Sequence, residues 1–170
     1  APVAAVPLNI GAAYYTRNSG ADILNVLAEG SGASAPQAAM SATINGATIA
    51  LSRDANRYYA SVPVNGTLPA SVSVTATDTG RPSKPNTQTA AVKDLVTIGL
   101  AEARCSGTGN NRSCLLTVQA SSSDDGSGPT GAPVLTLEHT RAPLVAGTLA
   151  TVSAAVPGAV TVLSSQGGVA

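Results

Sequence analysis

The sequence predicts an all-β chain made of two tandem β-sandwich modules with antiparallel sheets. Two observations lead to this prediction: short segments alternate apolar and polar residues, and three blocks of sequence recur in the same order in both halves. The composition agrees, because valine, threonine and small residues fill much of the chain while only 11% of the residues are charged. Such side chains fit a pleated sheet, and charged helix formers are scarce.

Individual strands are predicted from alternation and from turn signals. Residues 72–77 alternate strictly between an apolar face and a hydroxyl face. Asn45-Gly46 is a strong signal for a two-residue hairpin turn between two strands. We therefore expect strands at residues 8–16, 23–28, 40–44, 47–51, 57–64 and 72–77 in the first half, and at 96–104, 114–120, 134–138, 148–154 and 159–164 in the second.

The repeat divides the chain into two modules. Its blocks are residues 10–12 with 98–100, 24–28 with 116–120, and 68–74 with 156–162, and Gly80 aligns with Gly168. The offset is 88 in the outer blocks and 92 in the middle one, so we expect the first hairpin loop to be four residues longer in the second copy. The predicted modules are residues 1–88 and 89–170, joined near the proline-containing segment 80–88.

The only two cysteines, Cys105 and Cys114, enclose a loop rich in glycine, serine and asparagine. Apolar segments flank both, which predicts a β-hairpin whose strand ends are bridged by a structural disulfide. A redox or metal-binding pair is the less favoured alternative, because metal sites use closer spacings and further ligands, and His139 is the only histidine. A disulfide implies an oxidising compartment, so we expect an extracellular or cell-surface location.

Three segments of the first half, residues 42–46, 57–64 and 68–76, resemble bacterial immunoglobulin-like (Ig-like) or fibronectin-III-like modules, and the pattern extends over both halves. The resemblance implies two tandem Ig-like β-sandwiches of a secreted or cell-surface protein. It also implies a role as a spacer, an adhesive stalk, a pilus or filament subunit, or an accessory domain of an exported enzyme. The core tryptophan and the inter-sheet cysteine pair of antibody domains are absent, which argues against the antibody type itself.

Charge and motifs argue against several classes of function. The net charge is zero and only Lys84 and Lys93 are lysines, so we expect no nucleic-acid partner. No apolar run is long enough to span a bilayer, so we expect no membrane insertion. The chain has no phosphate-binding or dinucleotide fingerprint and no G-x-S-x-G motif, and a single histidine after a predicted strand is more often exposed or capping than catalytic. We therefore expect neither an enzyme nor a cofactor or metal site.

The segment Asp124-Asp125-Gly126-Ser127-Gly128 leaves two interpretations open. Its oxygens could bind Ca²⁺, although the segment lacks the spaced acids and the terminal glutamate of an EF-hand. A mobile polar loop spanning residues 121–131 is the favoured interpretation.

The four tyrosines form two adjacent pairs, Tyr14-Tyr15 and Tyr58-Tyr59. Neighbouring residues on a strand face opposite ways, so we expect one tyrosine of each pair to support the core and the other to face outward. An outward tyrosine is a possible protein or glycan contact, which makes these four residues a possible interface.

The N-terminal segment is a possible donor strand for another subunit, because residues 1–10 are uncharged and Val3, Val6, Leu8 and Ile10 are apolar. An ordinary first strand or a frayed terminus is the alternative. We expect a non-catalytic structural module of an extracellular assembly: a filament or pilus-type subunit that polymerises with itself, or a stalk or spacer beside flanking domains of a longer chain. An adhesin or accessory binding domain that recognises protein or glycan is the alternative function.

Overall fold

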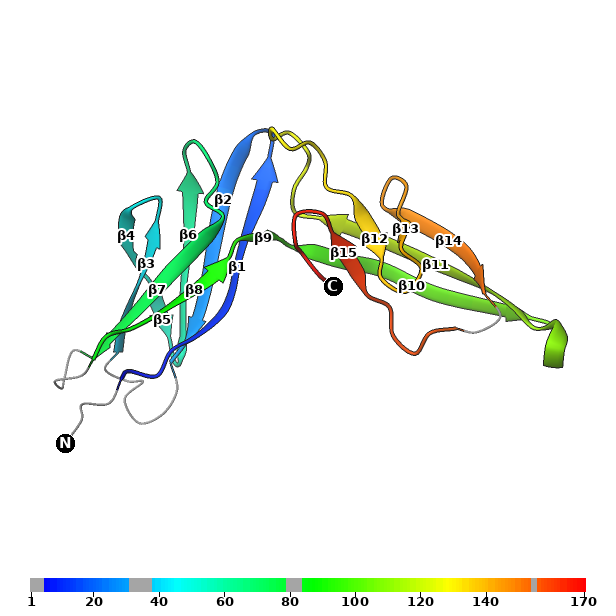
Figure 1. Ribbon diagram of the computed structural model, residues 1–170, viewed down its shortest axis with the longest axis horizontal. Coiled ribbons are helices and arrows are strands. Elements are labelled where there is room, and N and C mark those ends of the chain that lie inside the picture. Colours follow the sequence, from blue (N-terminus) through cyan, green and yellow to red (C-terminus); the bar gives the residue numbers. More distant parts are fainter. Residues whose placement is uncertain (1–4, 31–37, 79–83, 154–155) are drawn as a thin grey trace. The chain divides into compact units, whose positions relative to one another are not determined.

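A computed structural model describes residues 5–30, 38–78, 84–153 and 156–170 (Figure 1). Apart from the short 3₁₀ turn Gly109–Asn111, the regular structure of these residues consists of β-strands. The chain divides into two compact units. The first comprises Ala1–Thr16 and Ala21–Lys93, and the second comprises Arg17–Gly20 and Asp94–Ala170.

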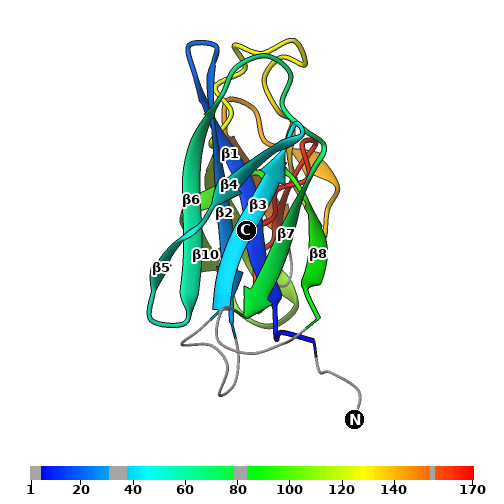
Figure 2. The same ribbon diagram turned by 90° about the vertical axis from the view of Figure 1, so that its left-hand side faces the viewer.

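Two sheets form the first unit, except that the strand-end residues Arg17, Asn18 and Asp94 are counted with the second unit. One has the order β5-β6-β2-β1-β9, with bounds Ser52–Asp54, Arg57–Val64, Ala21–Glu29, Asn9–Asn18 and Lys93–Asp94. The other has the order β4-β3-β7-β8, with bounds Ala47–Ala50, Ala38–Ile44, Ser71–Asp78 and Asn86–Ala91. The β2–β6, β5–β6, β3–β4, β3–β7 and β7–β8 pairs are antiparallel. Figure 2 shows β3 and β7 as a layer in front of β1 and β2.

The core of the first unit lies between these two sheets. Alternate residues of β2 and of β7 are buried, which is the burial pattern that period-two alternation predicts. Leu24 and Val26 of β2 and Val72 and Val74 of β7 all belong to one cluster of sixteen buried apolar side chains. Burial of this kind is the main favourable contribution to folding.

The second unit also has two sheets. One has the order β10-β11-β14, with bounds Val96–Ser106, Ser113–Ser122 and Thr148–Ser153. The other has the order β13-β12-β15, with bounds Ala142–Pro143, Leu135–Leu137 and Val162–Ser164. All its strand pairs are antiparallel. Among the described residues, its core cluster contains eight buried apolar side chains, against sixteen in the cluster of the first unit.

The two units share one strand order. Along the chain, β1, β2, β3, β4, β6 and β7 correspond to β10, β11, β12, β13, β14 and β15, and the corresponding strands have the same neighbours within each sheet. The β1–β2 turn has two residues, Ser19 and Gly20, whereas the β10–β11 turn runs over the six residues 107–112. This difference of four residues equals the change in the repeat offset.

Some details differ from the sequence-based expectation. Residues 86–88, expected in a linker, begin strand β8, which pairs with β7 from Asn86 to Ala91. The first unit consequently runs through Lys93. Polar alternation, Asn-Thr-Gln-Thr, hid this strand, because an edge strand carries fewer apolar side chains than a central one. The short strands β5 and β13 were also not expected, and Gly80 lies outside the described residues.

Candidate functional site

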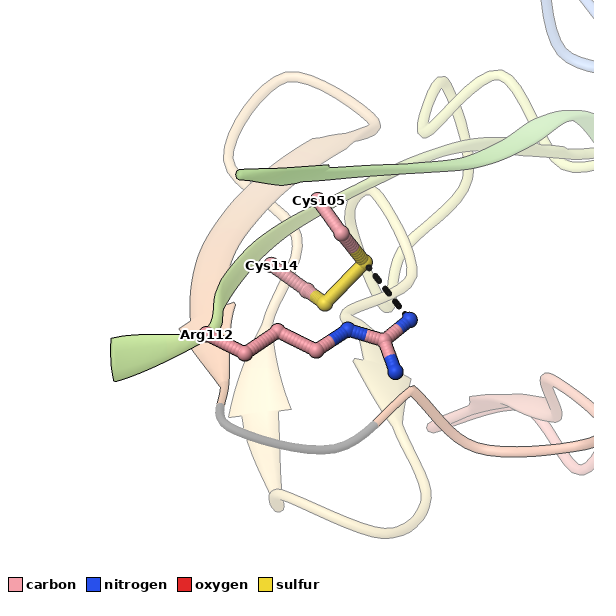
Figure 3. The surroundings of a disulfide bond; sticks show 3 residues. All are labelled: Cys105, Arg112 and Cys114. Carbon is pink, nitrogen blue, oxygen red and sulfur yellow. Dashed lines mark hydrogen bonds between the residues drawn. A yellow bond between two sulfur atoms is a disulfide. The ribbon is translucent and has the colours of Figure 1, made fainter. Parts of the chain in front are cut away.

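The disulfide closes the far end of the β10–β11 hairpin. Cys105 and Cys114 are directly opposite each other in the antiparallel register, and their sulfur atoms are bonded at 2.05 Å (Figure 3). Cys114 is 1% exposed, whereas Cys105 is exposed. Arg112 Nη2 donates a hydrogen bond to Cys105 Sγ at 3.5 Å and so lies over the bridge. The hairpin therefore has a covalently fixed end, as the loop composition predicted.

Removal of this disulfide is expected to destabilise the second unit. Replacing both Cys105 and Cys114 by alanine should lower its free energy of unfolding by about 2–3 kcal/mol, because a bridge that closes a loop of this length restricts the unfolded chain. Denaturant unfolding monitored by amide hydrogen exchange in β11 would measure this loss. Reduction of the unaltered chain should give the same loss, and an unchanged stability in both experiments would contradict the prediction.

The tyrosines divide into buried and outward residues. Tyr15 and Tyr58 are 3% and 1% exposed and belong to the core cluster of the first unit, and the Tyr58 hydroxyl donates to the Ala38 carbonyl oxygen at 2.8 Å. Tyr14 is half-buried, and Tyr59 is 46% exposed. A contact surface in this region can therefore use Tyr59 and the open part of Tyr14, but not the two buried rings.

The described part of the possible donor strand lies in the core of its own unit. Val6 and Leu8 are buried there, and Ile10 packs against the same cluster. Two side-chain amides of β8 hold this segment: Asn86 Nδ2 donates to the Val6 carbonyl at 2.8 Å, and Gln88 Nε2 donates to the Leu8 carbonyl at 2.7 Å. Val3 lies outside the described residues.

The acidic loop is hydrogen-bonded rather than open. Within the second unit, Arg17 Nη1 lies 3.0 Å from Asp124 Oδ2, and both side chains are buried. The Gly126 N–H donates to Asp124 Oδ1 at 2.9 Å. A buried carboxylate needs such partners, because an unpaired buried charge costs several kcal/mol. These contacts differ from the mobile loop expected from composition, which could not reveal a partner so distant in sequence.

The neighbouring carboxylate is also engaged. Asp125 accepts hydrogen bonds from the hydroxyl and N–H of Ser127 and from the N–H of Ser19. These bonds, chiefly the one from the Ser127 hydroxyl, hold the pKa of the Asp125 carboxyl below its usual value. Both carboxylates of this loop therefore accept hydrogen bonds within the unit.

A second buried carboxylate, Asp94, fastens the C-terminal turn of the second unit. Its Oδ1 accepts from the Gly168 N–H at 2.8 Å, and its Oδ2 accepts from the Ser122 hydroxyl. Asp94 is 3% exposed, and a Cβ on Gly168 would lie 2.5 Å from the Asp94 carbonyl oxygen. Only glycine fits this close approach. Sequence reasoning missed Asp94. With the repeat offset of 88, Asp94 aligns with the apolar Val6 of the first copy, so an acid at this position is unusual and could have drawn attention to it.

The remaining chemical candidates do not converge on one place. His139 is exposed in the turn after β12. Within residues 5–30, 38–78, 84–153 and 156–170, no group of three or more histidine, cysteine, aspartate or glutamate side chains is arranged to hold a metal ion. No helix in the described part of the chain has the length and apolar character needed to cross a membrane.

The features with defined geometry are therefore the bridged β10–β11 hairpin, the buried carboxylates of Asp94 and Asp124 and the outward face around Tyr59. Comparison of the chain with protein-family models, with curated protein sequences and with solved structures finds no match.

Proposed function

We propose that this chain is a non-catalytic structural module of an extracellular assembly, built from two tandem Ig-like β-sandwiches. The observation that carries the proposal is the repeated strand order of the two units. Repetition of one apolar-cored unit is typical of proteins that provide length and spacing, because each unit folds around its own core while the series sets the reach.

The Ig-like assignment within this proposal draws on sheet order. In Ig-like sandwiches, strands D-E-B-A form one sheet and strands of the C-F-G set form the other, often with an additional C′ strand. The first unit has β5-β6-β2-β1 in one sheet and β4-β3-β7-β8 in the other, which is the same order if β1 is taken as strand A. The second unit has the corresponding A-B-E and C′-C-F strands in β10-β11-β14 and β13-β12-β15.

The extracellular part of the proposal is supported by the bridged hairpin. Disulfides persist in oxidising compartments and are rare in reducing ones, so the Cys105–Cys114 bridge is compatible with export. The second unit also has the smaller core, and a covalent bridge compensates for limited burial in small exported domains.

Electron microscopy of the purified chain tests the assembly role. In the filament form of the proposal, images taken at rising protein concentration show ordered particles of increasing length. In the stalk form, the chain stays dispersed, and both units resist proteolysis as separate folded bodies. Cleavage throughout either unit under native conditions would contradict both forms, because a spacer must stay folded without a partner.

One observation favours a second candidate, a binding role for the first unit. On the outward face of its five-stranded sheet, Leu27 lies directly opposite Tyr59, and these side chains are 40% and 46% exposed. Ile23, on the same face of β2, is 44% exposed. A glycan and matrix-protein binding screen of the intact chain and of Tyr59→Ser tests this adhesin-type role. Binding that Tyr59→Ser abolishes supports it, and absence of binding across the panel argues against it.

A further inference from the structure

Three edge strands of the first unit are short and the fourth is covered, although β9 accounts for only two residues beside the ten-residue strand β1. Edge strands β4 and β5 have four and three residues, and β9 has two. The long edge strand β8 is accompanied by the N-terminal segment, through a bridge between Ala5 and Lys84 and through the amides of Asn86 and Gln88. Proteins use short or covered edges to prevent pairing with other chains.

The second unit differs at β10. This edge strand has eleven residues and pairs with β11 alone in the part of the chain that the structure describes. Figure 1 shows the β10–β11 hairpin running past the ends of β12 and β15. From Gly99 to Ser106 every side chain of β10 is exposed except that of Glu102, which is half-buried. A long and exposed edge of this kind is a template for strand addition.

The backbone groups on the free edge can be assigned. The Cα atoms of Cys105 and Cys114 are 3.9 Å apart, which is the close spacing of a non-hydrogen-bonded pair in an antiparallel ladder. In such a pair the backbone N–H and C=O groups point away from the partner strand. Cys105 and, at every second position, Ala103 and Ala101 therefore direct these groups to the side of β10 that β11 does not cover.

The charges on this edge are self-complementary. Glu102 and Arg104 lie on the same face of β10, with Arg104 Nε 2.8 Å from Glu102 Oε1. If a second β10 pairs antiparallel with Ala103 opposite Ala103, each Glu102 comes to lie opposite an Arg104 of the other copy. Opposite charges in directly facing positions stabilise a strand pair, and like charges destabilise it.

We propose that β10 is a self-association surface, on which residues 100–106 pair antiparallel with the same residues of a second copy of this chain. The register shift between Ile98 and Leu100 and the turn at Gly107 bound the paired segment. The Cys105–Cys114 disulfide holds the Ser106 end of the paired segment in an extended conformation before pairing, which lowers the entropic cost of association. The contact is two-fold and joins a pair of chains. This self-association rests on the proposed assembly role, because a second copy of the chain would be the partner within that assembly.

Charge reversal tests the contact without removing backbone groups. Sedimentation velocity of the intact chain over a wide concentration range is expected to show a monomer–dimer equilibrium that weakens as salt is added. In Glu102→Arg or in Arg104→Glu, like charges face each other twice, and the dimer dissociation constant should rise about tenfold. The double variant Glu102→Arg/Arg104→Glu restores opposite charges and should associate as the unaltered chain does.

Mixing the two single variants gives the sharper result. Glu102→Arg presents only positive charges on this edge and Arg104→Glu only negative ones, so each should associate about tenfold more weakly alone, while the mixture should form a mixed dimer at least as tightly as the unaltered chain dimerises. Glu138→Arg, a reversal at an exposed position after β12 of the same unit, is the matched control and should leave association unchanged. Recovery in the mixture also shows that both single variants are folded.

Several outcomes would overturn the contact. These are an unaltered chain that stays monomeric at every concentration, single variants that associate as well as the unaltered chain, and a mixture that stays monomeric. Filaments in electron micrographs that persist unchanged in both single variants would remove this contact and leave the proposed assembly role standing. Mixed dimers without filaments would support the contact and argue against the filament form of that role.

Discussion

Replacement of Asp94 by alanine is expected to lower the free energy of unfolding of the second unit by about 3 kcal/mol, because hydrogen bonds to a charged acceptor contribute about 1.5–3 kcal/mol each and a buried amide left without an acceptor adds to the loss. Asp94 accepts from the N–H of Gly168 and from the hydroxyl of Ser122, and it is 3% exposed. The substitution therefore leaves two donors without their acceptor and frees the C-terminal turn.

The readout can be resolved by unit. All four tyrosines lie in the first unit, so tyrosine fluorescence reports the unfolding of that unit, and amide hydrogen exchange reports the unfolding of the second. Asp94→Ala should accelerate exchange of the Gly168 amide while leaving the tyrosine signal unchanged. Asp94→Asn keeps the shape and one acceptor oxygen, so most of the lost stability should return. A loss in Asp94→Ala no larger than in the exposed-acid control Glu138→Ala would show that these hydrogen bonds contribute little.

Replacement of Leu137 by alanine is expected to lower the free energy of unfolding of the second unit by about 2–5 kcal/mol, which is the usual cost of the lost burial and the cavity that remains. Leu137 is fully buried on β12, the central strand of its sheet. Among the described residues, the core cluster of this unit contains eight buried apolar side chains including Leu137, so few neighbours can move to fill the cavity. The second unit should unfold well below the denaturant concentration that unfolds the unaltered unit.

The chain offers a matched control for this substitution. Leu115 lies on β11 of the same unit but is 42% exposed, so Leu115→Ala should cost less than about 1 kcal/mol. Hydrogen exchange in β11 during denaturant unfolding measures both variants with one probe. Equal losses in the two variants would mean that the core is not organised around β12.

Local patterns were enough to predict the elements of this fold. Asn45 and Gly46 both have positive φ, 48° and 81°, as a two-residue hairpin turn between β3 and β4 requires. Strand β7 was expected from the alternation of residues 72–77 and extends over Ser71–Asp78. These features depend on residues that are adjacent in the sequence, because turn residues set the local backbone angles and alternating residues set which side chains are buried. The disulfide belongs with them, because its cysteines flank one short loop.

The candidate surfaces depended on contacts that local patterns do not encode. The tyrosine pairs indicated alternation, but which ring of each pair is buried followed only from the packing of β1 and β6 on the opposite sheet. Val6 and Leu8 had the apolar spacing of a donor strand, and the structure places them in the core of their own unit. The sequence of an apolar segment does not indicate whether it packs into the core of its own unit or of another copy, because hydrophobic burial is not directional.

The sequence by itself determined that this is an all-β chain with a repeated order of strands and one bridged hairpin, because alternation, turn residues and cysteine spacing act over short distances. Only the tertiary structure decided how the buried charges are satisfied. Arg17 binds Asp124 across 107 residues of sequence and Asp94 binds Gly168 across 74, and each pairing exists because folding brings distant segments together. The tertiary structure also decided that β10 is an edge strand, because the position of a strand in its sheet depends on which other strands pair with it.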